Sequence, residues 1–368
     1  MIRCLGLFVV LALAGLILSC NNESNFDSQF RHSDKSASPE SLALFAKLEM
    51  LSRKGSMLGH QDAVAYGIGW EGSDFRSDIN DVCGDFPAVF GWDLGHIGDS
   101  INIDGVSFER MLYWASIVHQ KGGINTYSWH ARNMHTGASS WDLNTNIPDL
   151  LPGGEKHEVF LQKLDLLAEF FNALTDSEGK LIPVIFRPYH EMNGHWFWWG
   201  TKSCTADEYK NLFRFTVDYF REKKQMHQLV YSYSTDVYET AAEYLEFYPG
   251  DDYVDILGVD DYKGIKSRET LDKTINCLSI ISKLASEKNK LYTLSETGFE
   301  TLSDSLWFSE VLLPVIATSK LQTKPLWVLL WRNARPDHFY APYPGHTSVP
   351  DFITFKNHPL TLFLNDIH

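Results

Sequence analysis

The chain contains eight short apolar runs that are separated by longer amphipathic segments. The runs are Ser56–Gly59, Pro87–Trp92, Gly123–Trp129, Pro183–Arg187, Leu229–Tyr233, Ile256–Val259, Leu291–Leu294 and Trp327–Trp331. Most are continuously apolar rather than alternating, which is typical of parallel strands covered on both faces. Helical spacing of apolar residues marks Pro39–Arg53, Phe108–Gln120, His157–Leu174, Ala206–Lys223 and Thr270–Glu287. Strand and helix alternate eight times, which predicts an α/β fold of the (β/α)8 TIM barrel type.

Polar side chains follow these runs at the point where each predicted strand ends. They are His60, Gln61, Asp62, Asp93, His130, His190, Glu191, Ser234, Thr235, Asp236, Asp260, Asp261, Tyr262, Ser295, Glu296, Arg332 and Asn333. Barrel enzymes build their active sites at the C-terminal ends of the strands. Helix capping also favours Asp, Ser and Thr at such positions, but it does not account for His and Glu. The pattern therefore predicts an active site at the C-terminal face of the barrel.

The composition indicates one domain. A length of 368 residues fits either two average domains or one barrel. No Pro-, Ser- or Gly-rich linker divides the chain after about residue 40, so we expect a single domain over residues 39–368. The net charge of −15 and the lack of a basic cluster argue against binding to nucleic acid or to anionic membrane surfaces. The 11 tryptophans and 16 tyrosines suit sugar rings, but a large barrel core explains them equally well.

The N-terminus has the features of a secretory signal. Arg3 is followed by the apolar stretch Leu5–Leu18, which is too short to span a bilayer comfortably. Ile17–Cys20 resembles the lipobox of bacterial lipoproteins, in which cleavage before the cysteine leaves that cysteine diacylated. We expect a signal peptide over residues 1–19 and lipidation at Cys20. An ordinary secreted protein with an incidental cysteine is the alternative.

The residues after Cys20 are polar and rich in Ser and Asn, so we expect a flexible tether over residues 20–38. Residues 21–25 lack the dense acidic run that resembles a surface-export signal in some lipoproteins. We therefore expect a lipoprotein of a Gram-negative bacterium that is held at the membrane only by its lipid and faces the periplasm rather than the cell surface.

Three cysteines remain if Cys4 leaves with the signal peptide and Cys20 carries lipid. These are Cys83, Cys204 and Cys277. In an oxidising compartment they can form at most one disulfide bond, and three buried thiols are equally compatible with the sequence. Their spacing matches no zinc-binding pattern.

The candidate chemistry centres on Glu191, which lies in the aromatic stretch Arg187–Gly200. A carboxyl group that aromatic rings remove from water keeps its proton toward neutral pH and can donate it to a leaving glycosidic oxygen. Glu296, just past the seventh apolar run, is the best candidate for a second carboxyl group. A separation of about 5–5.5 Å would give retention of anomeric configuration and about 6.5–9.5 Å would give inversion. The strand positions favour the shorter separation, with Glu296 as nucleophile and Glu191 as acid/base.

Other chemistries lack the motif spacing they need. His190 and His195 are five positions apart, whereas the zinc-binding helix of metalloproteases has its two histidines four positions apart. The chain contains no Gly-x-Ser-x-Gly motif of serine hydrolases. Lys121–Ile124 lacks the glycine spacing of a phosphate-binding loop. We therefore expect no metal and no cofactor.

From about Ser38 onward the chain resembles glycoside hydrolase family 26, which consists mainly of β-mannanases. The most specific motif is the His-Glu pair followed by Trp-Phe-Trp-Trp-Gly within Arg187–Gly200. Further matches are Ser128–His130, Gly258–Tyr262 and Trp331–Ala334. The resemblance implies a retaining enzyme on a (β/α)8 barrel, with Glu191 as the acid/base and Glu296 as the nucleophile.

The resemblance also implies roles for polar neighbours of the two glutamates. We expect Tyr262 to donate its hydroxyl to Glu296. His190 is expected to form a hydrogen bond with that carboxylate or with a sugar hydroxyl. His130 and Asp260 are expected to bind hydroxyls of the sugar in the −1 subsite, next to the cleaved bond.

Three aromatic residues complete the expected cleft. Trp331 would form the floor on which the −1 sugar lies, and Trp196 and Phe197 would line the leaving-group side. Without the family match, a core position is equally compatible with such single His and Trp residues. Arg187 is expected to form an internal ion pair that supports the site.

The sequence therefore predicts a monomeric β-1,4-mannanase that acts on β-mannan or galactomannan, cutting either inside chains or at their ends. Alternatives are a mixed-linkage β-1,3-1,4-glucanase, a β-1,3-xylanase, or an inactive carbohydrate-binding lipoprotein. The segments Arg132–Gly154 and Arg335–Pro350 are long enough to close one end of the cleft, which would favour short products such as mannobiose.

Overall fold

A closed barrel of eight parallel strands forms the centre of the computed structural model, which describes residues 30–368. The barrel strands are β1 (Ser56–Gln61), β4 (Val89–Asp93), β5 (Ile124–Trp129), β6 (Val184–Pro188), β7 (Leu229–Asp236), β8 (Ile256–Asp261), β9 (Leu291–Thr297) and β10 (Trp327–Leu330). Each pairs in parallel with its neighbour, and β10 pairs with β1 from Met57 opposite Trp327 onward, which closes the barrel. The predicted single-domain (β/α)8 fold is confirmed.

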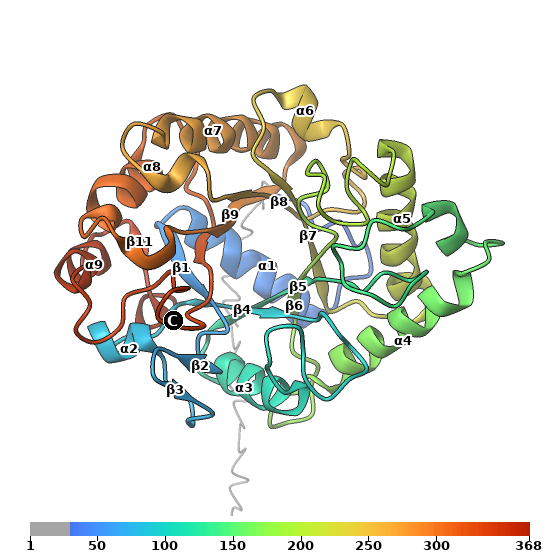
Figure 1. Ribbon diagram of the computed structural model, residues 1–368, viewed down its shortest axis with the longest axis horizontal. Coiled ribbons are helices and arrows are strands. Elements are labelled where there is room, and N and C mark those ends of the chain that lie inside the picture. Colours follow the sequence, from blue (N-terminus) through green and yellow to red (C-terminus); the bar gives the residue numbers. More distant parts are fainter. Residues whose placement is uncertain (1–29) are drawn as a thin grey trace, which may run out of the picture.

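Helices surround the strands in a ring (Figure 1). They are α2 (Asp78–Cys83), α3 (Phe108–Gln120), α4 (His157–Ala173), α5 (Ala206–Asp218), α6 (Ala241–Leu245), α7 (Leu271–Lys288), α8 (Leu313–Ala317) and α9 (Val349–Lys356). Two π-helical turns, η2 (Tyr219–Lys223) and η5 (Phe308–Leu312), adjoin α5 and α8. Short 3-10 turns are η1 (Ile147–Leu150), η3 (Gly264–Lys266), η4 (Glu300–Leu302) and η6 (Leu364–Asp366). The hairpin of β2 (Tyr66–Gly67) and β3 (Trp70–Glu71) follows β1, and β11 (Thr361–Leu362) pairs with the start of β1.

Local sequence signals explain where the helices begin and end. The side chain of Thr205 accepts a hydrogen bond from the backbone of Glu208, whose carboxylate bonds back to Thr205, so α5 starts with a capping box. Ser107 caps α3 in a similar way. At the other end of a helix, Asn289 adopts the left-handed conformation that stops α7.

One further helix, α1 (Pro39–Ser52), closes the N-terminal end of the barrel and lies behind the strands at the centre of Figure 1. Its apolar side chains Phe45, Leu48 and Leu51 are buried in one cluster with Met57 of β1 and Val89 of β4. The N-terminal end of the barrel is therefore a packed core, which leaves the opposite end for chemistry.

The structure corrects the predicted tether at residues 30–38. His32, Ser33 and Asp34 are buried, although their polarity indicated a solvated chain. The backbone N–H of Ser33 donates to Asp255 (2.5 Å), and His227 lies 2.8 Å from the Asp34 carboxylate. The strap residues thus bond to Asp255 and His227, which lie just before β8 and β7, so this part of the prediction is wrong. We call residues 30–38 the N-terminal strap.

The predicted signal peptide, the lipidation at Cys20 and the rest of the tether lie outside the described residues. Within residues 30–368, Cys83, Cys204 and Cys277 are all free thiols, of which Cys83 is only partly buried. Burial raises the pKa of Cys83 to about 11 and that of Cys204 to about 12. In the same part of the chain, none of the helices combines the length and the apolarity that crossing a membrane requires.

Candidate active site

Glu191 and Glu296 lie at the C-terminal end of the barrel, as their positions after the fourth and seventh runs predicted. Glu296 is the sixth residue of β9, and Glu191 is the third residue after the end of β6 at Pro188. The backbone at Glu191 is in the left-handed region (φ +55°), which is strained for a residue with a side chain. Its N–H donates to the Ser234 carbonyl oxygen (2.9 Å), and this bond fixes the turn against β7. The strained turn aims the carboxyl group into the mouth of the barrel.

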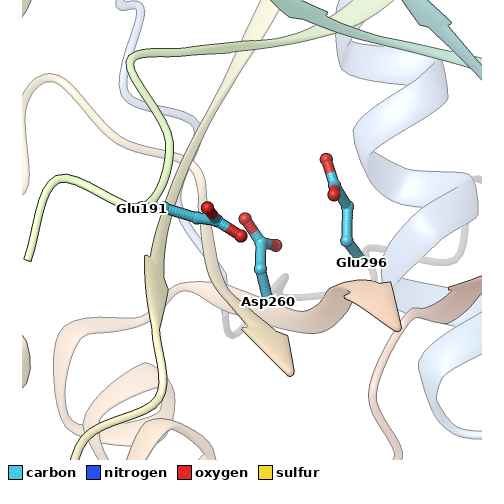
Figure 2. Close-up of side chains that lie close together, drawn as sticks. All are labelled: Glu191, Asp260 and Glu296. Atoms are coloured by element: carbon cyan, nitrogen blue, oxygen red, sulfur yellow. The ribbon is translucent and has the colours of Figure 1, made fainter. Parts of the chain in front are cut away.

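Three carboxyl groups meet there. Glu191, Asp260 and Glu296 each contribute one oxygen to a group whose members lie within 4.8 Å of one another. Figure 2 shows Glu191 reaching toward Asp260 of β8, with Glu296 on the neighbouring strand. One oxygen of Glu191 thus lies no more than 4.8 Å from one oxygen of Glu296, close enough for the short separation that retaining glycosidases use.

The surroundings of Glu191 favour its protonated form. Burial raises its pKa well above the ordinary value, and the negative charges of Asp260 and Glu296 raise it further. The indole N–H of Trp196 donates to one carboxyl oxygen (2.8 Å) and opposes part of this rise. Glu191 therefore retains a proton into the pH range where ordinary glutamates have lost theirs.

Glu296 has two donors of a different kind. The Arg187 guanidinium donates to one carboxyl oxygen, and the Tyr262 hydroxyl donates to the other at 3.1 Å. Together they fix the orientation of the carboxylate on β9. The second guanidinium nitrogen of Arg187 donates to Asp260 at 2.8 Å, so the ion pair expected of Arg187 is present and joins two of the three carboxylates.

Burial and a neighbouring positive charge have opposite effects on the pKa of Asp260. Burial raises its pKa to about 7, against the lowering effect of Arg187. One carboxyl oxygen accepts hydrogen bonds from Arg187 and Ser234, while the other has no partner among the described residues. Three convergent carboxylates could in principle hold a cation. Here, however, the buried guanidinium already supplies positive charge to Asp260 and Glu296, which fits an arrangement that works without a metal ion.

His130 forms a buried ion pair with Asp93 at the ends of β5 and β4. The ring nitrogen Nδ1 lies 2.6 Å from the carboxylate, which also accepts bonds from Ser128 (2.6 Å) and the Gly95 N–H (2.6 Å). Burial opposes the charge on His130, but the carboxylate outweighs it and raises the pKa of the ring. The pKa of Asp93 falls to about 2, because His130 and the hydrogen bonds outweigh its burial. The pair fixes His130 beside His190, with the ring centroids 4.5 Å apart.

His190 is neutral at ordinary pH. Burial lowers its pKa well below the usual value, and the neighbouring charges of Arg187 and His130 lower it further. In the described part of the chain no hydrogen bond joins its ring to Glu296, and its Nδ1 atom has no partner. Of the two contacts expected for His190, this leaves the contact with a sugar hydroxyl.

In the aromatic stretch after Glu191, three rings are buried and hold the loop in place, and one ring is partly exposed. Trp198 donates to the Ala131 carbonyl (2.8 Å) and Trp199 to the His190 carbonyl (2.7 Å), so these two buried rings hold the loop in place. Phe197 is also buried, where it stacks on Trp199 and its edge meets His130. Trp196 is only partly buried and is the ring of this stretch that faces the mouth.

Two features of the site were not predicted as parts of it. Trp141, half exposed in the loop after β5, stacks on His130 with centroids 5.7 Å apart and meets Phe197 at 5.5 Å. Trp331 lies 6.3 Å from the same histidine, so His130 has an aromatic ring of each of two loops beside it. The only signal in the sequence was a large aromatic residue in a polar loop.

The second unpredicted feature is a polar cluster at the ends of β1 and β10. Tyr66 donates to Asp62 (2.6 Å), and Arg332 lies 3.1 Å from Asp104 and donates to Tyr66 (3.3 Å). Burial raises the pKa of Asp104 to about 6, although Arg332 opposes the rise. Asp62 and Arg332 were noted as strand-end residues, but their pairing through Tyr66 and Asp104 was not.

A pair of carboxyl groups at this separation, on the strand ends of a (β/α)8 barrel, is the arrangement of the retaining glycoside hydrolases. The chain belongs to glycosyl hydrolase family 26, whose family model matches residues 33–292. This family match confirms the resemblance seen in the sequence motifs.

Curated relatives extend the comparison. A protein of Bifidobacterium adolescentis named mannan endo-1,4-beta-mannosidase is 34% identical over 351 residues, which cover 88% of this chain and 34% of that protein. A Bacillus subtilis protein of the same name is 28% identical over 69% of this chain and 68% of its own length. The chain thus spans about a third of the first of these relatives.

Solved structures share the fold over nearly the whole barrel. A family 26 β-mannanase from Bacteroides ovatus superposes with a TM-score of 0.85 at 42% identity, covering 89% of this chain and 96% of that one. A modular endo-β-1,4-mannanase from Cellulomonas fimi also gives a TM-score of 0.85, at 32% identity, over 92% of this chain and 78% of its own.

Proposed function

We propose that this chain is a retaining β-1,4-mannanase that hydrolyses β-mannan or galactomannan to manno-oligosaccharides. The observation that carries the proposal is the short separation of Glu191 and Glu296 at the mouth of a family 26 barrel. The curated relatives named mannan endo-1,4-beta-mannosidase and the similar solved mannanases support the choice of substrate.

The reaction proceeds by double displacement. Glu296 attacks the anomeric carbon while Glu191 gives its proton to the departing glycosidic oxygen, which forms a covalent glycosyl-enzyme and releases the first product. Glu191, now ionised, removes a proton from water, which attacks the same carbon and frees Glu296. The raised pKa of Glu191 suits the first step, and the two donors to Glu296 aim the nucleophile.

The remaining site residues bind the substrate in this proposal. His130, His190 and Asp260 contact hydroxyls of the sugar in the −1 subsite. Trp331 forms the floor under that sugar and Trp196 lines the leaving-group side, while the buried ring of Phe197 packs behind His130. Trp141 adds an aromatic surface next to His130.

The test uses soluble residues 21–368 and a time course of products from linear β-mannan. We expect cleavage with retention of anomeric configuration, and a loss of activity by about 10³-fold or more in Glu296→Ala, because the nucleophile is removed. A Glu296→Ala variant with wild-type activity on mannan would exclude this mechanism. Glu178→Ala, which changes an exposed glutamate, is the matched control.

A mixed-linkage β-glucanase is the second candidate. A protein of Acetivibrio thermocellus named endoglucanase H is 36% identical over 160 residues, which cover 42% of this chain and 15% of that protein. Parallel digestion of mixed-linkage β-glucan separates the two. Cleavage of glucan alone keeps the mechanism and replaces the substrate, whereas a folded protein that cuts neither polymer supports an inactive carbohydrate-binding protein.

The same time course distinguishes internal from terminal cleavage. The loop after β5, which carries Trp141, and the loop after β10 both border the cleft, and we infer that they restrict one end of it. Mannobiose from the first minutes is the expected result. An early ladder of many lengths would instead indicate an open cleft with internal cleavage.

We also infer that the protein is a lipoprotein anchored through Cys20 and facing the periplasm. The strap is consistent with such an anchor. The backbone N–H of Arg31 donates to the carbonyl of Asn289, just before β9, on the face of the barrel opposite the active site. A tether that joins the barrel there leaves the cleft directed away from the membrane. Loss of acyl labelling and of membrane association in Cys20→Ala is expected. Digestion of the protein by protease added to intact cells would contradict the periplasmic location.

A further inference from the structure

Helix α1, which crosses the closed end of the barrel (Figure 1), is apolar on two opposite faces. Its inward face packs into the N-terminal core described above. Its exposed residues are also all apolar, and we call them the α1 stripe: Pro39, Leu42, Ala43, Ala46 and Met50. The exposed residues of α7, by contrast, are all polar: Asp272, Lys273, Asn276, Lys283 and Glu287. A helix that is apolar all round normally has both faces covered, but within the described residues nothing covers the α1 stripe.

Spacing and exposure make the α1 stripe a continuous surface. Its residues recur at intervals of three and four positions, which places them on one side of the helix. Leu42 and Met50 are 49% and 45% exposed. A cavity of about 270 Å³ beside Ala43 extends the apolar surface toward β5, with Ile124 and Pro183 among its lining residues. The stripe is therefore a patch rather than a set of scattered apolar side chains, and such patches mark interaction sites.

Positive charges border the α1 stripe. Lys35 lies on the strap just before α1, and Lys54 lies just after the helix. Lys324 lies beside the end of α1, because its backbone N–H donates to the carbonyl of Ser52 (3.3 Å). Within residues 30–368 no ion pair involves any of these three lysines. They come from segments far apart in the sequence, so no continuous basic cluster marks them.

The acidic side chains of α1 do not balance these lysines, although the chain as a whole has a net charge of −15. Glu49 is buried and forms an ion pair with Arg53 (2.8 Å). The other acidic residue of the helix is Glu40, in its first turn. An apolar stripe with a basic border is complementary to a phospholipid surface that contains anionic headgroups.

The described part of the chain begins beside the same helix. Phe30 packs against the cluster that contains the inward face of α1. The ring of His32 lies 5.3 Å from that of Phe45 and 3.0 Å from the hydroxyl oxygen of Ser41, both on α1. Cys20 lies ten positions before Phe30, so even a fully extended connection between them reaches about 35 Å at most. A lipid on Cys20 would therefore keep the α1 stripe close to the bilayer, at a high effective concentration.

We propose that the α1 stripe docks on the surface of a phospholipid bilayer and thereby fixes the orientation of the barrel. At 14 residues α1 is shorter than the roughly 20 that cross a bilayer. It lies parallel to the surface, with Leu42 and Met50 at the level of the acyl chains and the lysines among the headgroups. The active site, at the opposite end of the barrel, then faces away from the membrane. The inference rests on the proposed lipid anchor and is independent of the substrate.

Vesicle binding by soluble residues 21–368 tests the apolar contact. The variant is Leu42→Ser/Met50→Ser, and the matched control is Leu306→Ser/Ile353→Ser, which changes two residues of similar exposure (44% and 38%) outside the α1 stripe. We expect the partition coefficient on vesicles of phosphatidylcholine and phosphatidylglycerol to fall about tenfold in the variant, because two half-exposed apolar side chains are lost from the contact. The control is expected to partition as the wild type does.

A second pair of variants tests the charges. Lys35→Gln/Lys54→Gln is expected to lower binding to vesicles that contain phosphatidylglycerol by about tenfold at low salt, and to leave binding to pure phosphatidylcholine unchanged. The matched control is Lys202→Gln/Lys273→Gln, which changes two exposed lysines outside this border. Its binding to both kinds of vesicle is expected to equal that of the wild type.

The full chain, carrying its lipid, tests the orientation. Ala46→Cys places a thiol in the middle of the α1 stripe, and Lys283→Cys places one at an exposed position of α7. We expect a water-soluble maleimide to label Ala46→Cys in the soluble chain but not in the lipidated chain on vesicles. Lys283→Cys is expected to be labelled in both. Mass spectrometry of the labelled peptides separates these sites from Cys83.

Equal labelling of Ala46→Cys in both forms overturns the proposal, and so does equal vesicle binding by the wild type and Leu42→Ser/Met50→Ser. If acyl labelling finds no lipid on Cys20, the anchor proposal fails, and vesicle binding by the soluble chain alone decides the inference. The kcat/KM on a soluble manno-oligosaccharide is expected to stay at the wild-type value in every variant, because none of them changes the active site. A failure of the mannanase proposal is therefore seen separately.

Discussion

The two glutamates of the site, Glu191 and Glu296, differ in the hydrogen-bond donors and charges that surround their carboxyl groups. Arg187 and Tyr262 both donate to Glu296, whereas within residues 30–368 the only donor to the Glu191 carboxyl group is the neutral indole of Trp196. The Arg187 guanidinium therefore bonds to Glu296 and Asp260 but not to Glu191, whose pKa is raised by burial and by the neighbouring negative groups. When the surroundings of two paired carboxyl groups differ in this way, one site can provide both a nucleophile and a proton donor.

This division leads to a prediction for Trp196→Phe. The hydrogen bond from Trp196 lowers the pKa of Glu191, so its removal raises that pKa further. Glu191 must be protonated in the first step, so the alkaline limb of the kcat/KM profile follows its pKa and is expected to move to higher pH. The profile against pH on a soluble manno-oligosaccharide measures this shift.

Trp141→Phe is the control for this experiment, since it makes the same change in a ring that does not contact Glu191. Its alkaline limb is expected at the wild-type position even if its KM rises. A Trp196→Phe limb that stays in place, or moves to lower pH, would mean that the indole does not influence the proton on Glu191.

At the scale of elements, the sequence predicted the strands that are marked by a local run of apolar residues. The eight apolar runs became the barrel strands, because parallel strands buried on both faces need such runs. The β2–β3 hairpin was not predicted, since Tyr66–Glu71 contains no such run. The pair of Tyr66 and Arg332 joins positions 266 residues apart, and only the closure of the barrel brings them together.

The N-terminal strap illustrates the same difficulty, because its polar residues are stabilised by partners distant in sequence. Asp34 is buried and lies 2.8 Å from His227, and its carboxylate also accepts the Ser36 N–H (2.8 Å). We expect Asp34→Ala to lower the free energy of unfolding by about 1–3 kcal/mol, because it removes a buried carboxylate that accepts the Ser36 N–H and bonds to His227. Activity is expected to stay at the wild-type level, since the strap lies on the face opposite the active site.

Urea denaturation together with kcat/KM measures both quantities for Asp34→Ala. The control is Glu178→Ala, an exposed position where a change within about 0.5 kcal/mol is expected. An Asp34→Ala variant as stable as this control would show that residues 30–38 behave as the solvated tether that the composition indicated.

At the scale of the whole molecule, the two ends of the barrel serve different purposes. The N-terminal end is sealed by α1 and the strap, with apolar packing and an ion pair between Asp34 and Arg221. The C-terminal end gathers acidic groups whose charged forms are disfavoured: the pKa of Asp260 rises to about 7 and that of Asp104 to about 6, each mainly through burial. The active-site end therefore lowers the stability of the fold at neutral pH, and the sealed end offsets this cost.

This cost can be measured for Glu191 through the pH dependence of stability. Its folded-state pKa lies well above the unfolded value of about 4.3. The folded state therefore binds the proton more tightly, so this contribution to stability is fully present below about pH 4 and is lost as the pH rises through the folded-state pKa. Glu191→Gln keeps a neutral side chain at every pH and does not suffer this loss. We expect the two proteins to differ little near pH 4, and the variant to become the more stable one as the pH rises to 9.

The difference between the two proteins is the informative quantity, because other groups give the wild-type curve opposite slopes. Burial lowers the pKa of His60 to about 4, so that histidine adds stability as the pH rises toward 6.5, and His190 acts in the same direction. Subtracting the Glu191→Gln curve from the wild-type curve, both from urea denaturation between pH 4 and 9, removes what the two proteins share. A difference that stays constant across this range would mean that Glu191 ionises as an ordinary glutamate, and the role of proton donor at neutral pH would then lose its physical basis.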